Sequence, residues 1–366
     1  VITGQRRGGY CIPASAWPKK QVPMADPGLL IDLAKIEYNA RHIVNLCAAR
    51  NIAVVGLTKA SCGDPQVAGA MLRGGVVAIG ESRMLNIARL QSAGIKTAYQ
   101  LLRTPSLSRA EQIVDCVDVS LNSELEVVAA LSAAAEKQGK RHAIIVMVDL
   151  GDLREGVWPD QLLSFVARCA QLKGVRVQGI GTNLSCLSGV VPTSAQLQRL
   201  VEYAEQVESL LAYPLEVISG GASNILPLIA AGDVPARIKN VRVGEAILLG
   251  RETIHRTALP NTFQDAFTLR AEVIEVKRKP SMPVGELAED AFGHHPNFED
   301  RGDIERAIVN IGRADIDVDN VQLEDSRFTI IGASSDHLLL DVTAGGGAVR
   351  VGDSLRFRLG YSALLA

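Results

Sequence analysis

The sequence has no apolar run of the roughly 18 residues that a membrane-spanning helix needs, so we expect no membrane partner. It has no long basic block either. Its 38 lysines and arginines nearly balance 40 aspartates and glutamates, for a net charge of −2, which argues against nucleic acid as a partner. The remaining composition, 47% hydrophobic and 21% charged, is typical of a globular protein.

Paired metal-binding or disulfide-forming residues are also missing. The six histidines contain no HExxH motif, and the six cysteines contain no CxxC pair. This spacing predicts neither a zinc site nor a disulfide framework, and it is typical of core cysteines in a reducing compartment such as the cytoplasm. The cysteines are Cys11, Cys47, Cys62, Cys116, Cys169 and Cys186.

From Ile52 onward, short β-branched runs alternate with amphipathic helical stretches. Such alternation predicts an α/β fold, and eight units in series favour a (β/α)8 TIM-like barrel over residues 29–251. An open doubly wound sheet is the alternative. Ser123 and Glu126 have capping-box spacing, which predicts a helix start at Ser123. The strand candidates are Ala53–Leu57, Val76–Gly80, Thr97–Leu102, Val117–Leu121, Ala143–Leu150, Val175–Gly181, Leu215–Ser219 and Val241–Val243.

Three segments lie outside the barrel pattern. Residues 252–366 show alternating strands without helices, which predicts a smaller, all-β C-terminal domain. Leu29–Leu33 is a ninth strand candidate and a candidate partner of that domain. Residues 1–28 are basic and rich in proline and glycine, so we expect a poorly ordered arm or an artificial extension.

The stretch Val54–Leu57 is an apolar run that ends abruptly at Thr58 and Lys59, before a turn of small residues. In an α/β barrel the carboxyl ends of the strands carry the chemistry. A lysine held there is partly desolvated, which suits its amine to Schiff-base formation or proton transfer. The alternative is a structural lysine whose stem packs on the barrel while its amine reaches solvent.

Two glycine turns, Ser219–Asn224 and Val241–Ala246, follow or include the last two strand candidates. Barrels often bind phosphate at these two loops, and glycine permits close approach of the backbone, although tight packing explains such turns equally well. The turns Asp149–Gly156 and Gly332–His337 are either surface turns or parts of a site. A lysine and a phosphate cradle at one barrel mouth together predict pyridoxal 5′-phosphate as the cofactor.

These stretches resemble the alanine-racemase-like, fold-type III pyridoxal-phosphate enzymes, and most closely their ornithine racemase branch. The resemblance covers almost the whole chain after residue 28, and its motifs are specific in combination. The motifs are GLTKASCGDP (56–65), SLNSELEV (120–127), MVDLGDLREG (147–156), SGGASN (219–224), VRVGEAILLG (241–250) and GASSDHLLLD (332–341).

The resemblance implies roles for the matched positions. Lys59 would be the internal-aldimine lysine and one of two acid/base groups at the substrate Cα. Arg154 would lie near the phenolic oxygen of the cofactor. Arg242 would face the pyridine nitrogen, with Glu245 as a carboxylate alternative. The other cofactor-binding positions would be Asn183, Tyr361 and a phosphate set made of Ser219, Gly220, Gly221, Ser223, Gly244 and Glu245.

The chain also departs from alanine racemases at four positions. Gly63 stands in place of a tyrosine, Met147 in place of a lysine that is often carbamylated, and Asn183 in place of the histidine that stacks on the ring. Arg313 replaces the second catalytic tyrosine, and a guanidinium is a poor base because it is always protonated.

Racemisation by two bases needs a proton donor on the face opposite the lysine. The turn Ser335-Asp336-His337 resembles the substrate-binding turn of basic amino-acid decarboxylases, and we expect it to cross a homodimer interface into the neighbouring barrel. Asp336 would then meet a substrate ammonium, and Ser335 or His337 would help to transfer the proton.

The sequence therefore predicts a racemase that interconverts the L- and D-forms of a free, basic, ornithine-like amino acid. One alternative is a decarboxylase of basic amino acids on the same scaffold. Another is a non-catalytic pyridoxal-phosphate homeostasis protein, although those carriers have a single barrel and no C-terminal β domain. A barrel without a cofactor is the remaining alternative.

Overall fold

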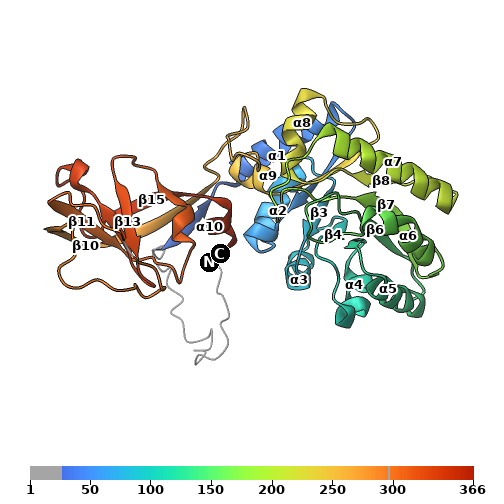
Figure 1. Cartoon of the computed structure of the whole chain (residues 1–366), viewed down its shortest axis with the longest axis horizontal. Coiled ribbons are helices and arrows are strands. Elements are labelled where there is room, and N and C mark those ends of the chain that lie inside the picture. Colours follow the sequence, from blue (N-terminus) through green and yellow to red (C-terminus); the bar gives the residue numbers. More distant parts are fainter. Residues whose placement is uncertain (1–26, 296) are drawn as a thin grey trace. The chain divides into compact units, whose positions relative to one another are not determined.

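The protein is described by a computed structural model that covers residues 27–295 and 297–366. Nearly all of the expected N-terminal arm, residues 1–28, lies outside the described residues. The chain divides into two compact units (Figure 1). Residues 32–266 form the first, the barrel unit, and residues 267–364 together with the strand Gly28–Ile31 form the second, the β unit.

The barrel unit is a closed ring of eight parallel strands in sequence order. Closure is direct, because β9 pairs with β2 through Val54 opposite Val241 and Gly56 opposite Val243. The predicted TIM-like barrel is thus confirmed, and the open-sheet alternative is wrong. The strands are β2 (Ala53–Leu57), β3 (Ala78–Glu81), β4 (Tyr99–Leu101), β5 (Val119–Asn122), β6 (His142–Met147), β7 (Val175–Gly181), β8 (Val217–Ser219) and β9 (Asn240–Val243).

Helices surround this ring, as Figure 1 shows. Side-chain caps fix the first residue of several helices. The Asp32 and Asp64 carboxylates cap α1 and α2, and Thr193 with Gln196 forms a capping box on α7. The helices are α1 (Leu33–Ala48), α2 (Pro65–Arg73), α3 (Met84–Ser92), α4 (Ala110–Cys116), α5 (Leu125–Lys137), α6 (Leu162–Ala170), α7 (Ser194–Leu211), α8 (Leu226–Ala231) and α9 (Glu245–Leu249). Short 3-10 turns are η2 (Lys59–Ser61), η3 (Leu107–Arg109), η4 (Pro159–Gln161) and η5 (Ser223–Ile225).

Apolar side chains fill part of the barrel interior, where Leu121, Ile145 and Met147 form a buried cluster. Met147 is 1% exposed, so the position at which many alanine racemases carry a modified lysine is here a core residue. Close strand packing also depends on glycine. A Cβ at Gly80 would lie 2.5 Å from Leu57 Cδ2, too close for any other residue without a shift of the neighbour.

The β unit is a seven-stranded antiparallel sheet in the order β12-β15-β10-β11-β14-β13, with β1 also paired to β10. A register shift between Val273 and Glu275 bends β10 where its partner changes from β15 to β11. The elements are β1 (Gly28–Ile31), β10 (Phe267–Pro280), β11 (Asp303–Val309), η6 (Val318–Asn320), β12 (Val321–Leu323), β13 (Thr329–Ala333), β14 (Leu338–Asp341), η7 (Thr343–Gly345), β15 (Ser354–Leu359) and α10 (Tyr361–Leu365).

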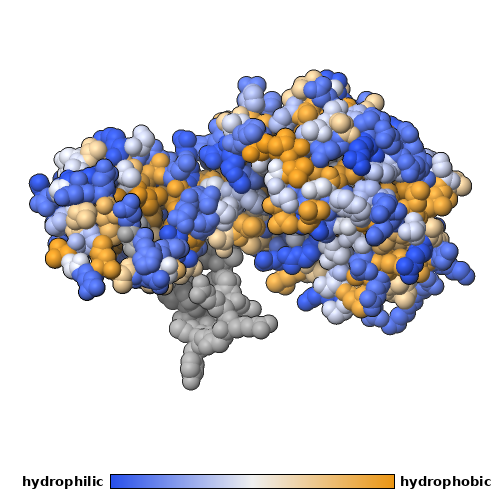
Figure 2. Space-filling model, viewed as in Figure 1, coloured by the Kyte–Doolittle hydropathy of each residue, from blue (hydrophilic) through white to orange (hydrophobic). Residues whose placement is uncertain are grey.

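The predicted combination of a barrel and a smaller β domain is therefore confirmed. A single-barrel carrier has no counterpart of this second sheet. Figure 2 shows hydrophilic residues over much of the visible face of both units, with apolar patches between them. Within residues 27–295 and 297–366, no helix combines the length and the apolar character needed to cross a membrane.

Candidate active site

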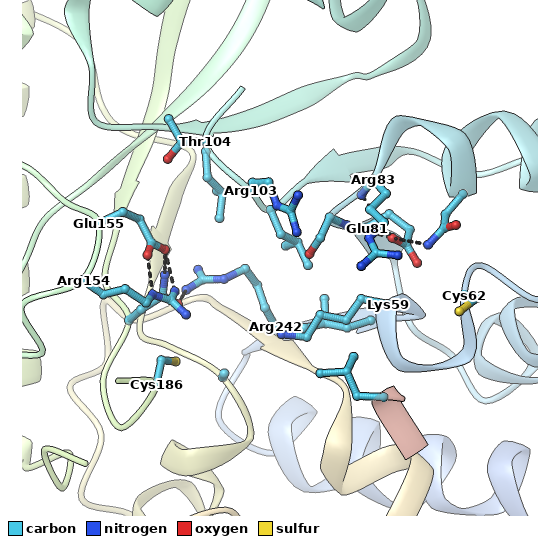
Figure 3. A pocket seen from close by; sticks show the side chains of 18 residues that line it. Lys59, Cys62, Glu81, Arg83, Arg103, Thr104, Arg154, Glu155, Cys186 and Arg242 are labelled. Carbon is cyan, nitrogen blue, oxygen red and sulfur yellow. Dashed lines mark hydrogen bonds and ion pairs between the residues drawn. The ribbon is translucent and has the colours of Figure 1, made fainter. Parts of the chain in front are cut away.

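A cavity of about 530 Å³ lies at the carboxyl ends of the barrel strands (Figure 3). Nearly every strand contributes to its wall, either through its last residues or through the loop that follows it. The lining side chains with polar or charged groups include Lys59 after β2, Arg83 after β3, Arg103 after β4, Arg154 and Glu155 after β6, Asn183 and Cys186 after β7, and Arg242 on β9. Four of the residues expected to bind the cofactor, Lys59, Arg154, Asn183 and Arg242, thus line one cavity.

The turn that carries Lys59 is held by a buried carboxylate. Glu81, at the end of β3, accepts hydrogen bonds from Thr58 Oγ1 at 3.1 Å, Asn86 Nδ2 at 3.1 Å and the Ser82 amide at 2.8 Å. Burial raises the pKa of Glu81, and these donors oppose the rise. Because Thr58 precedes Lys59 directly, Glu81 connects the lysine turn to β3 and α3.

Gly63 brings the same turn into contact with α3. Its φ is +63°, and a Cβ there would lie 2.7 Å from Asn86 Cβ. The position where alanine racemases carry a tyrosine therefore tolerates no side chain in this conformation without displacing the turn or α3. Lys59 itself is half-buried at the cavity wall.

Arg242 is 2% exposed, and its guanidinium is fixed by three acceptors. It donates to Thr182 O at 2.7 Å, to Asn183 Oδ1 at 2.9 Å and to Ser219 Oγ. Burial lowers the pKa of Arg242 to about 10. The side chain therefore stays protonated near neutral pH, so this wall of the cavity presents a hydrogen-bond donor and no base.

Glu155 connects Arg154 and Arg242, the two arginines expected to contact the cofactor. Its carboxylate accepts from Arg154 Nη2 at 2.5 Å, makes a second contact with Arg154 Nε, and accepts from Asn183 Nδ2 at 2.8 Å. Since Asn183 also accepts from Arg242, a continuous chain runs from Arg154 to Arg242, part of which the dashed lines in Figure 3 mark. The sequence reasoning missed Glu155, whose only signal was an acidic residue beside Arg154.

The charged turn Asp149–Gly156 is more than a surface turn. Asp152 is 1% exposed, and its carboxylate accepts the amides of Cys186 and Leu187 at 3.0 Å each. It thereby fastens the loop after β6, which carries Arg154 and Glu155, to the loop after β7.

The glycine turns after β8 and β9 also come together beside β2. Ser223 Oγ accepts the Ala246 amide at 3.3 Å, which joins the two turns. A Cβ at Gly244 would lie 3.0 Å from Leu57 Cβ, and Gly221 has a φ of +140°. The turns therefore depend on the absence of side chains at these positions, and Ala222, directly after Gly221, lines the cavity.

Two of the predicted residues here are engaged elsewhere. Ser219 is fully buried, and its hydroxyl donates to Asn240 Oδ1 at 2.6 Å while it accepts from Arg242. Glu245 pairs with Arg256 at 3.2 Å, and burial raises the pKa of its carboxyl. Of the two candidates for the ring nitrogen, only Arg242 lines the cavity among the residues that the structure describes.

The remaining predicted residues belong to the β unit. The exposed turn between β13 and β14 carries Ser335, Asp336 and His337, and Ser335 Oγ donates to Asp336 Oδ2 at 2.8 Å. Arg313 donates its amide to Ser334 O at 2.9 Å, and its guanidinium binds Asp319 at 2.8 Å. Arg313, which stands in place of the second catalytic tyrosine, is therefore next to the turn that is expected to supply the proton in place of that tyrosine.

Tyr361 is the first residue of α10 in the β unit.

Comparisons with known proteins agree with this geometry. The family model described as "Alanine racemase, N-terminal domain" matches residues 31–252. An ornithine racemase of Acetoanaerobium sticklandii is 38% identical over 340 residues, which cover 93% of this chain and 96% of that protein. A lysine racemase of Thermotoga maritima is 39% identical over 342 residues, again 93% of this chain and 96% of the relative.

Solved structures share the fold at lower identity. An alanine racemase from a D-cycloserine-producing Streptomyces lavendulae superposes with a TM-score of 0.73 at 19% identity, over 92% of this chain and 88% of that one. A D-threonine aldolase from Filomicrobium marinum gives a TM-score of 0.73 at 16% identity, over 93% and 88% of the two chains. At these identities the likeness concerns the fold alone.

Proposed function

Because the chain belongs to the alanine racemase family, we infer that its function is the racemisation of a free, basic amino acid. It is a pyridoxal 5′-phosphate-dependent isomerase. The relatives named ornithine racemase and lysine racemase match 93% of the chain. The observation that carries the conclusion is that Lys59, Arg242 and the turn after β8 line one cavity in such a chain.

The cavity fits this cofactor. It offers one lysine amine, guanidinium groups for anionic oxygens, and Ala222 of the glycine turn after β8, to which the Ser223 hydroxyl joins the turn after β9. Lys59 would hold the aldehyde carbon. Turn residues 221–223 and 244–245 would hold the phosphate. Ser219 is fully buried with its hydroxyl engaged by Asn240 and Arg242, and the Gly220 amide donates to Asn240 O, so neither is placed to contribute these groups.

When bound, pyridoxal phosphate supplies an electron-withdrawing ring that makes the Cα proton of an attached amino acid acidic. On one face of Cα, Lys59 Nζ would accept the proton of one enantiomer, and in the reverse direction it would donate the proton that forms that enantiomer. Arg242 would face the ring nitrogen, and since a guanidinium donates but does not accept, that nitrogen would stay unprotonated. Arg154, held by Glu155, would contact the phenolic oxygen.

The opposite face needs its own acid/base group, and we assign it to the turn Ser335-Asp336-His337 of a second copy in a homodimer. Support comes from the β unit, where the Arg313 loop contacts this turn through the Ala314 amide and Ser335 O at 2.9 Å. His337 or Ser335 would transfer the proton, and Asp336 would attract the ammonium of an ornithine-like side chain.

The proposed compartment is the cytoplasm. The five cysteines in the described part of the chain are free thiols, which favours a reducing environment.

Chiral analysis of products tests the proposed function. L-ornithine, L-lysine, L-arginine, L-alanine and L-serine are incubated separately with the holoenzyme, and the D-form should accumulate with ornithine and lysine. Lys59→Ala should abolish this conversion. Release of carbon dioxide without a D-product would establish the decarboxylase alternative instead, and no turnover with any amino acid would contradict the racemase.

A further inference from the structure

The cavity that holds Lys59 carries an excess of positive charge. Five cationic side chains line it, against the two carboxylates of Glu81 and Glu155. The cavity therefore attracts anionic groups. A basic amino acid carries both a carboxylate, which these cations attract, and a side-chain ammonium, which they repel. The cations are Lys59, Arg83, Arg103, Arg154 and Arg242.

Three of the five already have a task. Lys59 would hold the cofactor, Arg154 is neutralised by Glu155, and Arg242 is buried among three acceptors. Within residues 27–295 and 297–366, neither the Arg83 nor the Arg103 guanidinium takes part in an ion pair or a hydrogen bond with another side chain. Both residues are exposed, and Figure 3 shows them along the same side of the cavity.

Strand register explains why these two arginines lie together. Glu81 of β3 pairs with Leu101 of β4, and each arginine comes two residues after one member of this pair. The Leu102 amide donates to Glu81 O at 2.8 Å, which continues the pairing past the strand ends. Both arginines also line a second cavity of about 220 Å³, so they form a wall shared by the two cavities.

We propose that Arg83 and Arg103 bind the α-carboxylate of the amino-acid substrate. A guanidinium fork matches the two oxygens of a carboxylate, and two such forks in the loops after adjacent strands would fix its orientation. The same positive wall would repel the side-chain ammonium, so a basic substrate would bind in one direction only. This inference rests on the proposed function, because it takes a free amino acid as the ligand.

The test compares the holoenzyme with Arg83→Ala, Arg103→Ala and the double variant. Each is titrated with L-lysine and with L-lysinamide, which lacks the carboxylate charge, while the absorbance of the bound cofactor is followed. We expect the wild-type protein to prefer lysine, and the double variant to lose about 10- to 100-fold of that preference, since a hydrogen bond to a charged group is worth roughly 1.5–3 kcal/mol. KM for lysine should rise by a similar factor.

Arg109→Ala is the matched control. Arg109 is exposed and lines the 220 Å³ cavity but not the 530 Å³ cavity. Its loss should therefore leave the preference for lysine over lysinamide unchanged. Retained cofactor absorbance shows that each variant is folded. If the double variant keeps the wild-type preference for lysine over lysinamide, the inference is wrong. Failure of the wild-type protein to racemise lysine or ornithine would instead overturn the proposed function.

Discussion

At the residue scale, Glu155 links two of the residues proposed to contact the cofactor, Arg154 and Arg242. It is the only carboxylate, among the described residues, that contacts Arg154 directly, and it also holds Asn183, which in turn holds Arg242. Without it, two guanidinium groups would share one cavity with no carboxylate between them. Glu155 therefore acts through other residues, as a positioning residue for both arginines.

We expect Glu155→Ala to lower kcat/KM by about 10- to 100-fold, because removal of a charged hydrogen-bond partner costs roughly 1.5–3 kcal/mol. Glu155→Gln should cost less, since it keeps one acceptor oxygen but loses the charge. Both variants should also bind pyridoxal phosphate more weakly in a direct titration, a readout that does not depend on turnover.

Glu111→Gln is the control for loss of a carboxylate. Glu111 pairs with Lys137 at 2.6 Å, but both side chains are largely exposed, so the pair should contribute little. Cofactor affinity equal in Glu155→Ala and the wild-type protein would show that Arg154 and Arg242 do not need Glu155.

At the scale of secondary-structure elements, the barrel could be predicted because its strands are buried on both faces. Such strands appear in sequence as short apolar runs, for example Ala53–Leu57, whose predicted and observed bounds coincide. Local side-chain patterns were a less reliable guide to where helices begin. The predicted capping box at Ser123 and Glu126 is wrong, because α5 begins at Leu125 and its N-cap, Glu124, makes no side-chain hydrogen bond.

Contacts between loops could not be predicted in the same way. Glu155 meets Asn183 across 28 residues of sequence, and Arg83 and Arg103 lie side by side through the pairing of Glu81 with Leu101. Such proximity depends on barrel closure and strand register, which no local pattern records. The position of Lys59 at the barrel mouth was predictable, because a strand-end lysine before a turn of small residues is a local signal.

The residues directly after η2 contact α3, through Gly63 against Asn86 and through Arg89, which donates to Cys62 O at 3.2 Å, so a change at Gly63 should affect cofactor binding as well as stability. Gly63→Ala would place a methyl group 2.7 Å from Asn86 Cβ at a φ of +63°. Gly94→Ala is the matched control, because its φ is +78° but nothing lies within 4 Å of the added Cβ.

Both alanine variants should lower the melting temperature, since a left-handed conformation costs a non-glycine residue roughly 1–2 kcal/mol. Only Gly63→Ala should also weaken cofactor binding, because only there must the turn that carries Lys59 shift. Equal cofactor affinity in the two variants would show that Lys59 does not depend on the contact between Gly63 and α3.

At the scale of the whole molecule, the β unit combines β1, which precedes the barrel in sequence, with residues 267–364, which follow it. Ile31 pairs with Phe267 in the β unit, and the Asp32 amide donates to Ala266 O at 2.8 Å in the barrel unit, so the two connecting segments run side by side. The cofactor cavity belongs to the barrel unit, whereas the turn Ser335-Asp336-His337 belongs to the β unit. A homodimer would allow each turn to serve the barrel of the other copy.

Hybrid dimers test this sharing of sites. One chain carries Lys59→Ala, and the other carries Asp336→Ala together with His337→Ala; each has a different affinity tag, and the hybrid is purified over both. If sites are shared, one of the two sites in the hybrid combines an intact Lys59 with an intact turn, so racemisation should return although each parent homodimer is inactive. If each site is built from one chain, both sites in the hybrid are damaged and no activity returns.

Two controls make the hybrid experiment decisive. A hybrid of Lys59→Ala with a chain carrying all three substitutions has no intact Lys59, so it should stay inactive under either arrangement. The turn is exposed and is assigned to the substrate rather than to the cofactor, so its substitutions should leave cofactor binding unchanged. Full activity in the Asp336→Ala, His337→Ala homodimer would exclude these two side chains as the second acid/base group, and would leave Ser335 as the candidate on that face, because Arg313 cannot act as the base.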